Sequence, residues 1–160
     1  MSKFHMGNPD NEIINQDLIQ EILKKGKIIT LALTDGTNPY VVTLSYGLDS
    51  SQKAIYMHCS KTGLKIDIIR KNPLTCATII EDHGYVLDDC TQKYRSLVIW
   101  GKINIIEDLT EKKHGFSILF RHLEGENQKM AEKMKLDDAV FQDVGMLRLD
   151  IEQIDAKGNI

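Results

Sequence analysis

Hydrophobic residues near the start of the chain recur with the spacing of one helical face. The apolar positions between residues 18 and 23 predict a short helix, with Asn15 suited to cap its start and Gly26 suited to end it. The pattern then changes to the β-branched runs that are typical of strands, over residues 27–34 and 40–46. Turn-forming residues at 35–39 separate the two runs, so we expect a β-hairpin.

The rest of the chain alternates between strand patterns and turn signals, with helical interruptions. Residues 60–72 carry their apolar positions on one side of a predicted helix, which Pro73 ends. A long apolar run over residues 94–106 contains Gly101, where we expect a β-bulge or a sharp bend. The other predicted elements are strands over 54–58, 74–80 and 144–154, a turn at 48–52, a loop over 81–92, and helices over 110–123 and 127–134.

This order of elements predicts a mainly β fold with flanking helices. Six strands in mostly antiparallel order, with one short helix between the third and the fourth, are typical of a small closed or split β-barrel. The regular alternation of strands and helices that builds a Rossmann sheet is absent from the pattern. We therefore expect one domain over residues 1–160, with a helical hairpin at about 110–134 inserted into it.

Composition and charge narrow the function classes. Hydrophobic residues make up 42% of the chain and charged residues 27%, which is enough for a buried core, and the formal net charge of −3 argues against nucleic acid as a partner. The three cysteines show no CxxC spacing and the five histidines no HxH or HExxH motif, so no metal site is predicted. With no long apolar run either, we expect a reduced, cytoplasmic protein that does not contact membranes.

The segment from residue 56 to 65 carries the clearest chemical signal. It ends a strand and opens a helix, so Ser60 is placed to cap the helix while the backbone amides of residues 61–63 face outward. Lys61 and Lys65 lie four residues apart and add positive charge to one helical face. A phosphate fits such a site, and the alternative is an ordinary capped helix with two solvated lysines. The ATP and dinucleotide motifs GxxxxGK[ST] and GxGxxG are missing.

Two further groups of polar residues lie on predicted strands. His58 and Cys59 are adjacent on a strand, so their side chains point to opposite faces and are not expected to form a nucleophile–base pair. We expect Cys59 to face the core. His58 either faces a ligand or simply ends the strand. Tyr94 and Ser96 share one strand face, while Arg95 takes the other. These three residues can meet a ligand or a partner subunit, or Arg95 can be a surface residue of an edge strand.

In order, five blocks of sequence resemble the nitroimidazole-resistance family, within the superfamily of pyridoxamine 5′-phosphate oxidase-related, FMN-binding split barrels. The blocks are PYVVTLSYG at 39–47, IYMHCS at 55–60, GLKID at 63–67, NPLTC at 72–76 and YRSLVIWGK at 94–102. The resemblance extends from Asp17 to about Asp108, and residues 147–157 resemble the closing strand of the family. It differs at Thr43, where a proline is common, and at Leu64, where a second basic residue often stands.

The resemblance implies a six-stranded antiparallel split barrel that forms a homodimer and holds FMN at the subunit interface. Residues 41–45 would lie along the isoalloxazine ring, and residues 58–65 would surround the ribityl phosphate. The cofactor-binding residues that it implies are Val41, Val42, Thr43, Leu44, Ser45, His58, Cys59, Ser60, Lys61, Lys65, Tyr94, Arg95 and Ser96.

The implied activity is an oxidoreductase that passes electrons from a reduced nicotinamide through FMN to a small acceptor such as a nitroaromatic or a quinone. His58 is the candidate for a catalytic proton donor. The alternatives are a non-catalytic protein that binds or carries a flavin, a deazaflavin or haem, for which His114 or His122 would matter, and a barrel without cofactor that only mediates association.

Overall fold

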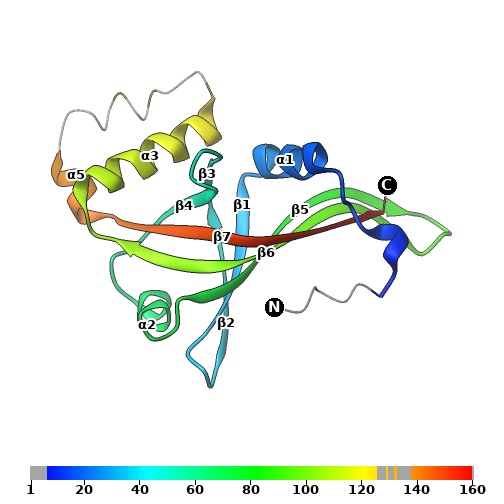
Figure 1. Ribbon diagram of the computed structural model, residues 1–160, viewed down its shortest axis with the longest axis horizontal. Coiled ribbons are helices and arrows are strands. Elements are labelled where there is room, and N and C mark those ends of the chain that lie inside the picture. Colours follow the sequence, from blue (N-terminus) through cyan, green and yellow to red (C-terminus); the bar gives the residue numbers. More distant parts are fainter. Residues whose placement is uncertain (1–6, 126–128, 130–131, 133–137, 160) are drawn as a thin grey trace.

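A long, curved antiparallel sheet is flanked by helices in the computed structural model of the protein (Figure 1). The structure describes residues 7–125, 129, 132 and 138–159. The helices are the 3-10 helix η1 (Pro9–Asn11), α1 (Gln16–Lys25), α2 (Leu64–Lys71), α3 (Leu109–Glu124) and α5 (Asp138–Asp143). The strands are β1 (Ile28–Thr34), β2 (Pro39–Ser45), β3 (Gly47–Asp49), β4 (Ala54–Cys59), β5 (Leu74–Val86), β6 (Thr91–Ile106) and β7 (Gly145–Asn159).

The sheet has seven strands in the order β2-β1-β5-β6-β7-β4-β3, so the prediction of six strands is wrong by one. The additional strand is β3, which pairs with β4 over three residues where a turn was expected. Such a short strand shows no periodicity of its own, and its pairing with β4 defines it. The two outermost strands, β2 and β3, do not pair with each other, so the sheet remains open. The prediction of a mainly β fold with flanking helices is confirmed.

The first helix and the bend in the long strand confirm two local predictions. Asn15 caps α1 by accepting hydrogen bonds from the backbone amides of Asp17 and Leu18, at 2.9 and 3.2 Å. The register between β6 and β7 shifts at Gly101, where the predicted bulge lies. A Cβ atom at Gly101 would come within 2.0 Å of the carbonyl oxygen of Asp150, so only glycine permits this close approach of the two strands.

The loop expected over residues 81–92 is instead the tip of a hairpin between β5 and β6. Its residues do not alternate between apolar and polar because the tip extends beyond β1 and covers no core (Figure 1). The final strand likewise continues beyond the predicted residues 144–154, to Asn159. The helix predicted over 127–134 falls almost entirely outside the described residues.

The core lies between the inner face of the sheet and the helices. Side chains from α1, α2 and the five strands β1, β4, β5, β6 and β7 form one buried cluster, which includes Ile22, Ile29 and Leu97, each 0% exposed. A second cluster packs α3 and α5 against β4 and β7 through Phe116 and Met146. Within the described residues, no helix is both long and apolar enough to cross a membrane.

The opposite, outer face of the sheet leaves large apolar side chains in solvent. Val41 of β2, Ile28 of β1 and Ile80 of β5 are 63%, 59% and 62% exposed. The helices of the described residues do not cover them, since α1, α2, α3 and α5 contribute their buried side chains to the core clusters. This face therefore has the character of a surface that a partner can cover.

Candidate functional site

A cleft of about 520 Å³ opens where the edge strand β2 approaches the end of β4 and the start of α2. Strands β2 and β4 are not hydrogen-bonded neighbours, so the cleft lies in the gap that the open sheet leaves. The lining residues are Thr43, Leu44, Ser45, His58, Cys59, Ser60, Lys65, Asp143 and Val144. Seven of these nine are residues that the sequence predicted to bind the cofactor.

The end of β4 presents His58 and Cys59 on opposite sides, as expected from strand alternation. His58 is exposed, and its ring lies 6.2 Å from the ring of Phe116 in α3. Cys59 packs against the core, and its thiol donates a hydrogen bond to the carbonyl oxygen of Ser60 at 3.2 Å. Burial raises the pKa of the Cys59 thiol, although the positive charge of Lys65 partly opposes this effect. The thiol of Cys59 is therefore protonated at neutral pH, so Cys59 forms part of the cleft wall and does not act as a nucleophile.

The helix that borders the cleft begins later than predicted. Ser60 does not cap it: α2 starts at Leu64, and its N-cap is Gly63, in the left-handed region at φ 113°. Gly63 has no side chain to satisfy the first amides of the helix, and no other side chain in the described part of the chain caps them. A Cβ atom at Gly63 would meet nothing within 4 Å, so the space beside the helix start is open. Free amides next to Lys65 favour an anion at this point.

The residues of β2 divide between the two faces of the sheet. Thr43 and Val41 point to the outer face, where the hydroxyl of Thr43 lies 2.9 Å from that of Thr30 in β1. Val42 and Leu44 pack against the core. The cleft thus opens onto the exposed outer face of the sheet through Thr43, while Val41 and Val42 lie next to it without lining it.

The three predicted residues of β6 lie outside this cleft. Arg95 is no surface residue: it is 9% exposed and forms ion pairs with Glu81 at 2.5 Å and Glu21 at 3.3 Å, which tie α1 to the sheet. Ser96 is 6% exposed on the other face of the strand. Tyr94 lies under the ammonium group of Lys157, 5.7 Å from the ring centre. Lys61 is exposed in the bend between β4 and α2.

Two cleft residues, Asp143 and Val144, had not been predicted from the sequence. They precede β7, and the antiparallel pairing of Cys59 with Gly145 brings them to the cleft across 84 residues of chain. No local pattern marks this juxtaposition. Asp143 adds a carboxylate to a lining that otherwise carries positive and neutral groups.

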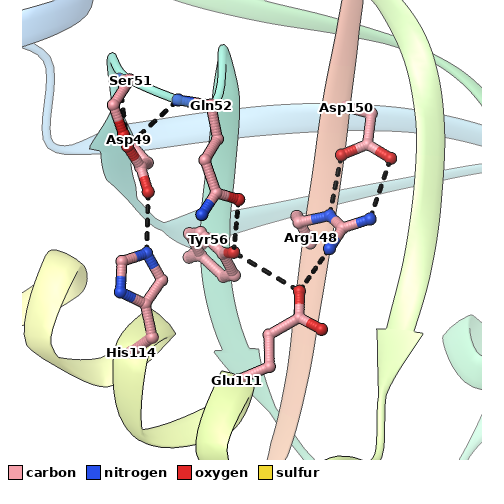
Figure 2. Close-up of polar contacts among 8 residues, drawn as sticks. All are labelled: Asp49, Ser51, Gln52, Tyr56, Glu111, His114, Arg148 and Asp150. Carbon is pink, nitrogen blue, oxygen red and sulfur yellow. Dashed lines mark hydrogen bonds and ion pairs between the residues drawn. The ribbon is translucent and has the colours of Figure 1, made fainter.

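A second group of polar residues lies where α3 faces β3, β4 and β7 and forms what we call the α3 brace (Figure 2). Its members are Asp49, Ser51, Gln52, Tyr56, Glu111, His114, Arg148 and Asp150. The nearly buried carboxylate of Asp49 accepts hydrogen bonds from Ser51 and from His114, whose Nε2 lies 2.7 Å away. Arg148 is held between Glu111 and Asp150. The pairing of Asp49 with His114 looks like a catalytic dyad, but these groups satisfy one another and connect α3 to β3, β4 and β7.

Comparisons with known proteins agree with the fold. A family model described as pyridoxamine 5′-phosphate oxidase matches residues 15–158. No curated protein matches the chain in sequence. Among solved structures, the chain is similar to a protein of Bacteroides thetaiotaomicron provisionally assigned to 5-nitroimidazole antibiotic resistance, with a TM-score of 0.77, 24% identity, and coverage of 96% of this chain and 95% of the other.

Two further structures share the fold at lower identity. A flavocytochrome of Azotobacter vinelandii aligns with a TM-score of 0.83 at 14% identity, over 100% of this chain and 75% of the other. A FAD-binding protein of Mesorhizobium loti aligns with a TM-score of 0.66 at 22% identity, over 92% and 96% of the two chains.

Proposed function

This chain belongs to the pyridoxamine 5′-phosphate oxidase family, and we propose that it is a homodimeric FMN-binding oxidoreductase. Electrons would pass from a reduced nicotinamide through FMN to a small acceptor such as a nitroaromatic or a quinone. The observation that carries the proposal is the cleft between β2, β4 and α2, because it places Lys65 and the uncapped start of α2 beside residues 43–45 of an edge strand.

The residues of the cleft fit a phosphorylated cofactor. The start of α2 offers backbone amides that no side chain of the described residues caps, and Lys65 lines the cleft beside them. Both features favour a dianionic phosphate, the amides through hydrogen bonds and the lysine through its charge. The volume of about 520 Å³ lies in the range of small-molecule and cofactor sites.

Each group has a role in this proposal. Lys65 and Lys61 would neutralise the phosphate, and the backbone of residues 43–45 would face the edge of the isoalloxazine ring. Asp143 suits the hydroxyl groups of the ribityl chain, because a carboxylate accepts hydrogen bonds and repels a phosphate. Bound FMN supplies hydride chemistry. His58, which lines the cleft and is exposed, would be the proton donor.

A second copy of the chain would complete the site. The cleft opens at Thr43 onto the outer face of the sheet, where Val41, Ile28 and Ile80 are exposed. Two such faces packed together would bury these side chains and close the cleft from above. In this dimer Ser96 and Tyr94, which share the outer face of β6, would lie at the interface rather than in the cleft of their own subunit.

The related structures named above support a flavin as ligand, since one is a flavocytochrome and another binds FAD. The flavocytochrome also favours a second candidate function, a flavin or haem carrier without reductase turnover. A deazaflavin carrier is the third ligand class to test.

The test is the absorbance spectrum of the purified protein, with mass spectrometry of the molecule released on denaturation. We expect flavin bands, FMN as the released mass, a dimer in solution and oxidation of NADH or NADPH when a quinone is added. A Soret band, or flavin binding without turnover, would favour the carrier. A protein that stays colourless after reconstitution with FMN would contradict the proposal.

A further inference from the structure

A groove distinct from the cofactor cleft runs between α1 and α3. In Figure 1 these helices lie above the sheet on either side of β3. Two hollows, of about 430 and 230 Å³, share Leu48 and Ser50 of the β3 region as wall residues, and we treat these adjacent hollows together as one groove. None of its lining residues belongs to the cofactor cleft.

The floor of the groove is apolar. It consists of side chains from both helices and from β3 and β7. They are Ile19, Leu23, Leu48, Ile118, Ile151 and Ile154. A ligand with a hydrocarbon chain or ring would bury apolar surface against this floor, which is the main favourable term in such binding.

The rim of the groove is basic. Lys24 of α1, Arg121 of α3 and Lys53 of the β3–β4 turn come from three different elements. All three are exposed, and no carboxylate of the described residues forms an ion pair with them. Glu152 is the acidic residue of the lining. A basic rim in a chain of net charge −3 is complementary to an anion.

Backbone strain occurs at the same rim. Lys53 adopts a φ of 51°, in the left-handed region that glycine or asparagine would occupy at lower cost. The turn is held in this form because the carboxylate of Asp49 accepts hydrogen bonds from the amides of Ser51 and Gln52, and the carbonyl of Lys53 accepts one from Ile151. A lysine therefore stands at the rim in spite of its backbone cost.

The groove walls are fixed in place before any ligand arrives. His122 of α3 lies 2.6 Å from the carbonyl oxygen of Gly26, just after α1, and Lys27 donates to the carbonyl of His122. His114 holds the other half of α3 to Asp49 (Figure 2). A preformed groove loses little conformational entropy on binding.

We propose that the groove between α1 and α3 binds a small amphipathic carboxylate, with its apolar body on the floor and its carboxylate at Arg121 and Lys24. The fork of the guanidinium suits a carboxylate in particular. This site is independent of the proposed FMN cleft, and it would be a place for a substrate or a regulator of the protein.

Calorimetric titration of the purified protein with three probes tests this. Octanoate has both features, acetate has only the charge, and octylammonium has the same chain with the opposite charge. We expect octanoate to bind about tenfold more tightly than either of the others, since each buried methylene adds affinity and only the carboxylate matches the rim. Equal binding of octanoate and octylammonium would overturn the proposal.

Matched variants locate the site. Arg121→Ala should weaken octanoate binding by about fivefold and the double variant with Lys24→Ala by about tenfold or more, because each removes one exposed ion pair. Lys71→Ala, at the exposed end of α2, should bind octanoate like the wild type. Lys65→Ala distinguishes the groove from the cofactor cleft. If octanoate binds more weakly to Lys65→Ala but unchanged to Arg121→Ala, the carboxylate lies in the cofactor cleft and the proposal is overturned. Circular dichroism verifies that each variant is folded.

Discussion

The cofactor cleft and the α3 brace contain similar residue types but use them in opposite ways. In the brace, each charged group has a partner within the protein, as Asp49 does in Ser51 and His114 and Arg148 does in Glu111 and Asp150. Among the described residues, Lys65 of the cleft forms no ion pair and no side chain caps the start of α2. Satisfied groups hold the fold together, whereas groups without internal partners are available to a ligand.

This difference predicts which substitutions affect stability and which affect binding. Residues of the brace should change the free energy of unfolding, and residues of the cleft should change the affinity for FMN. One position, Gly145, should change both.

The largest effect is expected for Gly145→Ala. A Cβ atom there would lie 2.7 Å from the carbonyl oxygen of Ser60 and 3.0 Å from that of Cys59, so β4 and β7 must separate at the wall of the cleft. We expect a loss of up to about 3 kcal/mol in the free energy of unfolding, measured in urea without cofactor, together with weaker FMN binding. The control is Thr62→Ala, an exposed substitution in the bend that follows Ser60. If Gly145→Ala is as stable as the wild type, β4 and β7 can separate at the cleft without a loss in the free energy of unfolding.

Lys65→Ala should affect binding alone. A charge-assisted contact to phosphate contributes about 2 kcal/mol, so the Kd for FMN should rise about 30-fold while the urea midpoint stays the same. Quenching of flavin fluorescence measures the affinity, and Lys71→Ala in the same helix provides the control. If both lysine variants bind FMN equally well, Lys65 does not contact the phosphate.

Asp49→Asn should affect stability alone. Burial disfavours the charged form of Asp49, but hydrogen bonds from Ser51, His114 and Gln52 outweigh it and hold the pKa below its usual value. A carboxylate whose pKa is lower in the folded state stabilises the protein above the unfolded pKa, about 3.9, and this contribution is lost as the pH falls through the folded pKa.

At pH 7 we therefore expect Asp49→Asn to cost about 1 kcal/mol, with FMN affinity unchanged. The difference from the wild type should shrink below about pH 4, because the carboxylate of the unfolded state is then protonated first and proton binding favours unfolding. Urea unfolding curves between pH 3 and pH 7 measure it. A difference that does not depend on pH would contradict the role assigned to the ionised carboxylate.

Features that are determined by residues close together in the sequence could be predicted, whereas features that depend on distant residues could not. The Asn15 cap and the Gly101 bulge follow from local residue chemistry, and both are confirmed. The start of α2 was misplaced because Ser60 is a good cap by residue type, whereas the left-handed turn at Gly63 begins the helix. Strand β3 was missed because three residues carry no period.

The site shows the same division. Residues 43–45 and 58–60 and Lys65 come together in one cleft, as their family resemblance led us to expect. Asp143 joins them only through the pairing of β4 with β7. Arg95 forms ion pairs with Glu81 and Glu21, both of which lie far from it in the sequence. Contacts of this kind depend on tertiary structure, and no local pattern encodes them.

The smallest effect concerns His122, which joins α3 to α1. Burial lowers the pKa of His122 in the folded protein, with a smaller contribution from the charge of Lys27, although the hydrogen bond to the carbonyl of Gly26 opposes the shift. The neutral form is therefore favoured in the folded state, and protonation favours the unfolded state. The stabilising contribution is complete above the unfolded pKa, about 6.5, and is lost as the pH falls through the lowered folded pKa.

We expect His122→Gln, whose amide can donate the same hydrogen bond, to reduce the loss of stability of the wild type between pH 7 and pH 5. Thermal unfolding at several pH values measures this slope, with His83→Gln on the exposed hairpin as control. A slope unchanged in His122→Gln and flattened in His83→Gln would assign the titration to the hairpin and leave the contact between α1 and α3 independent of pH.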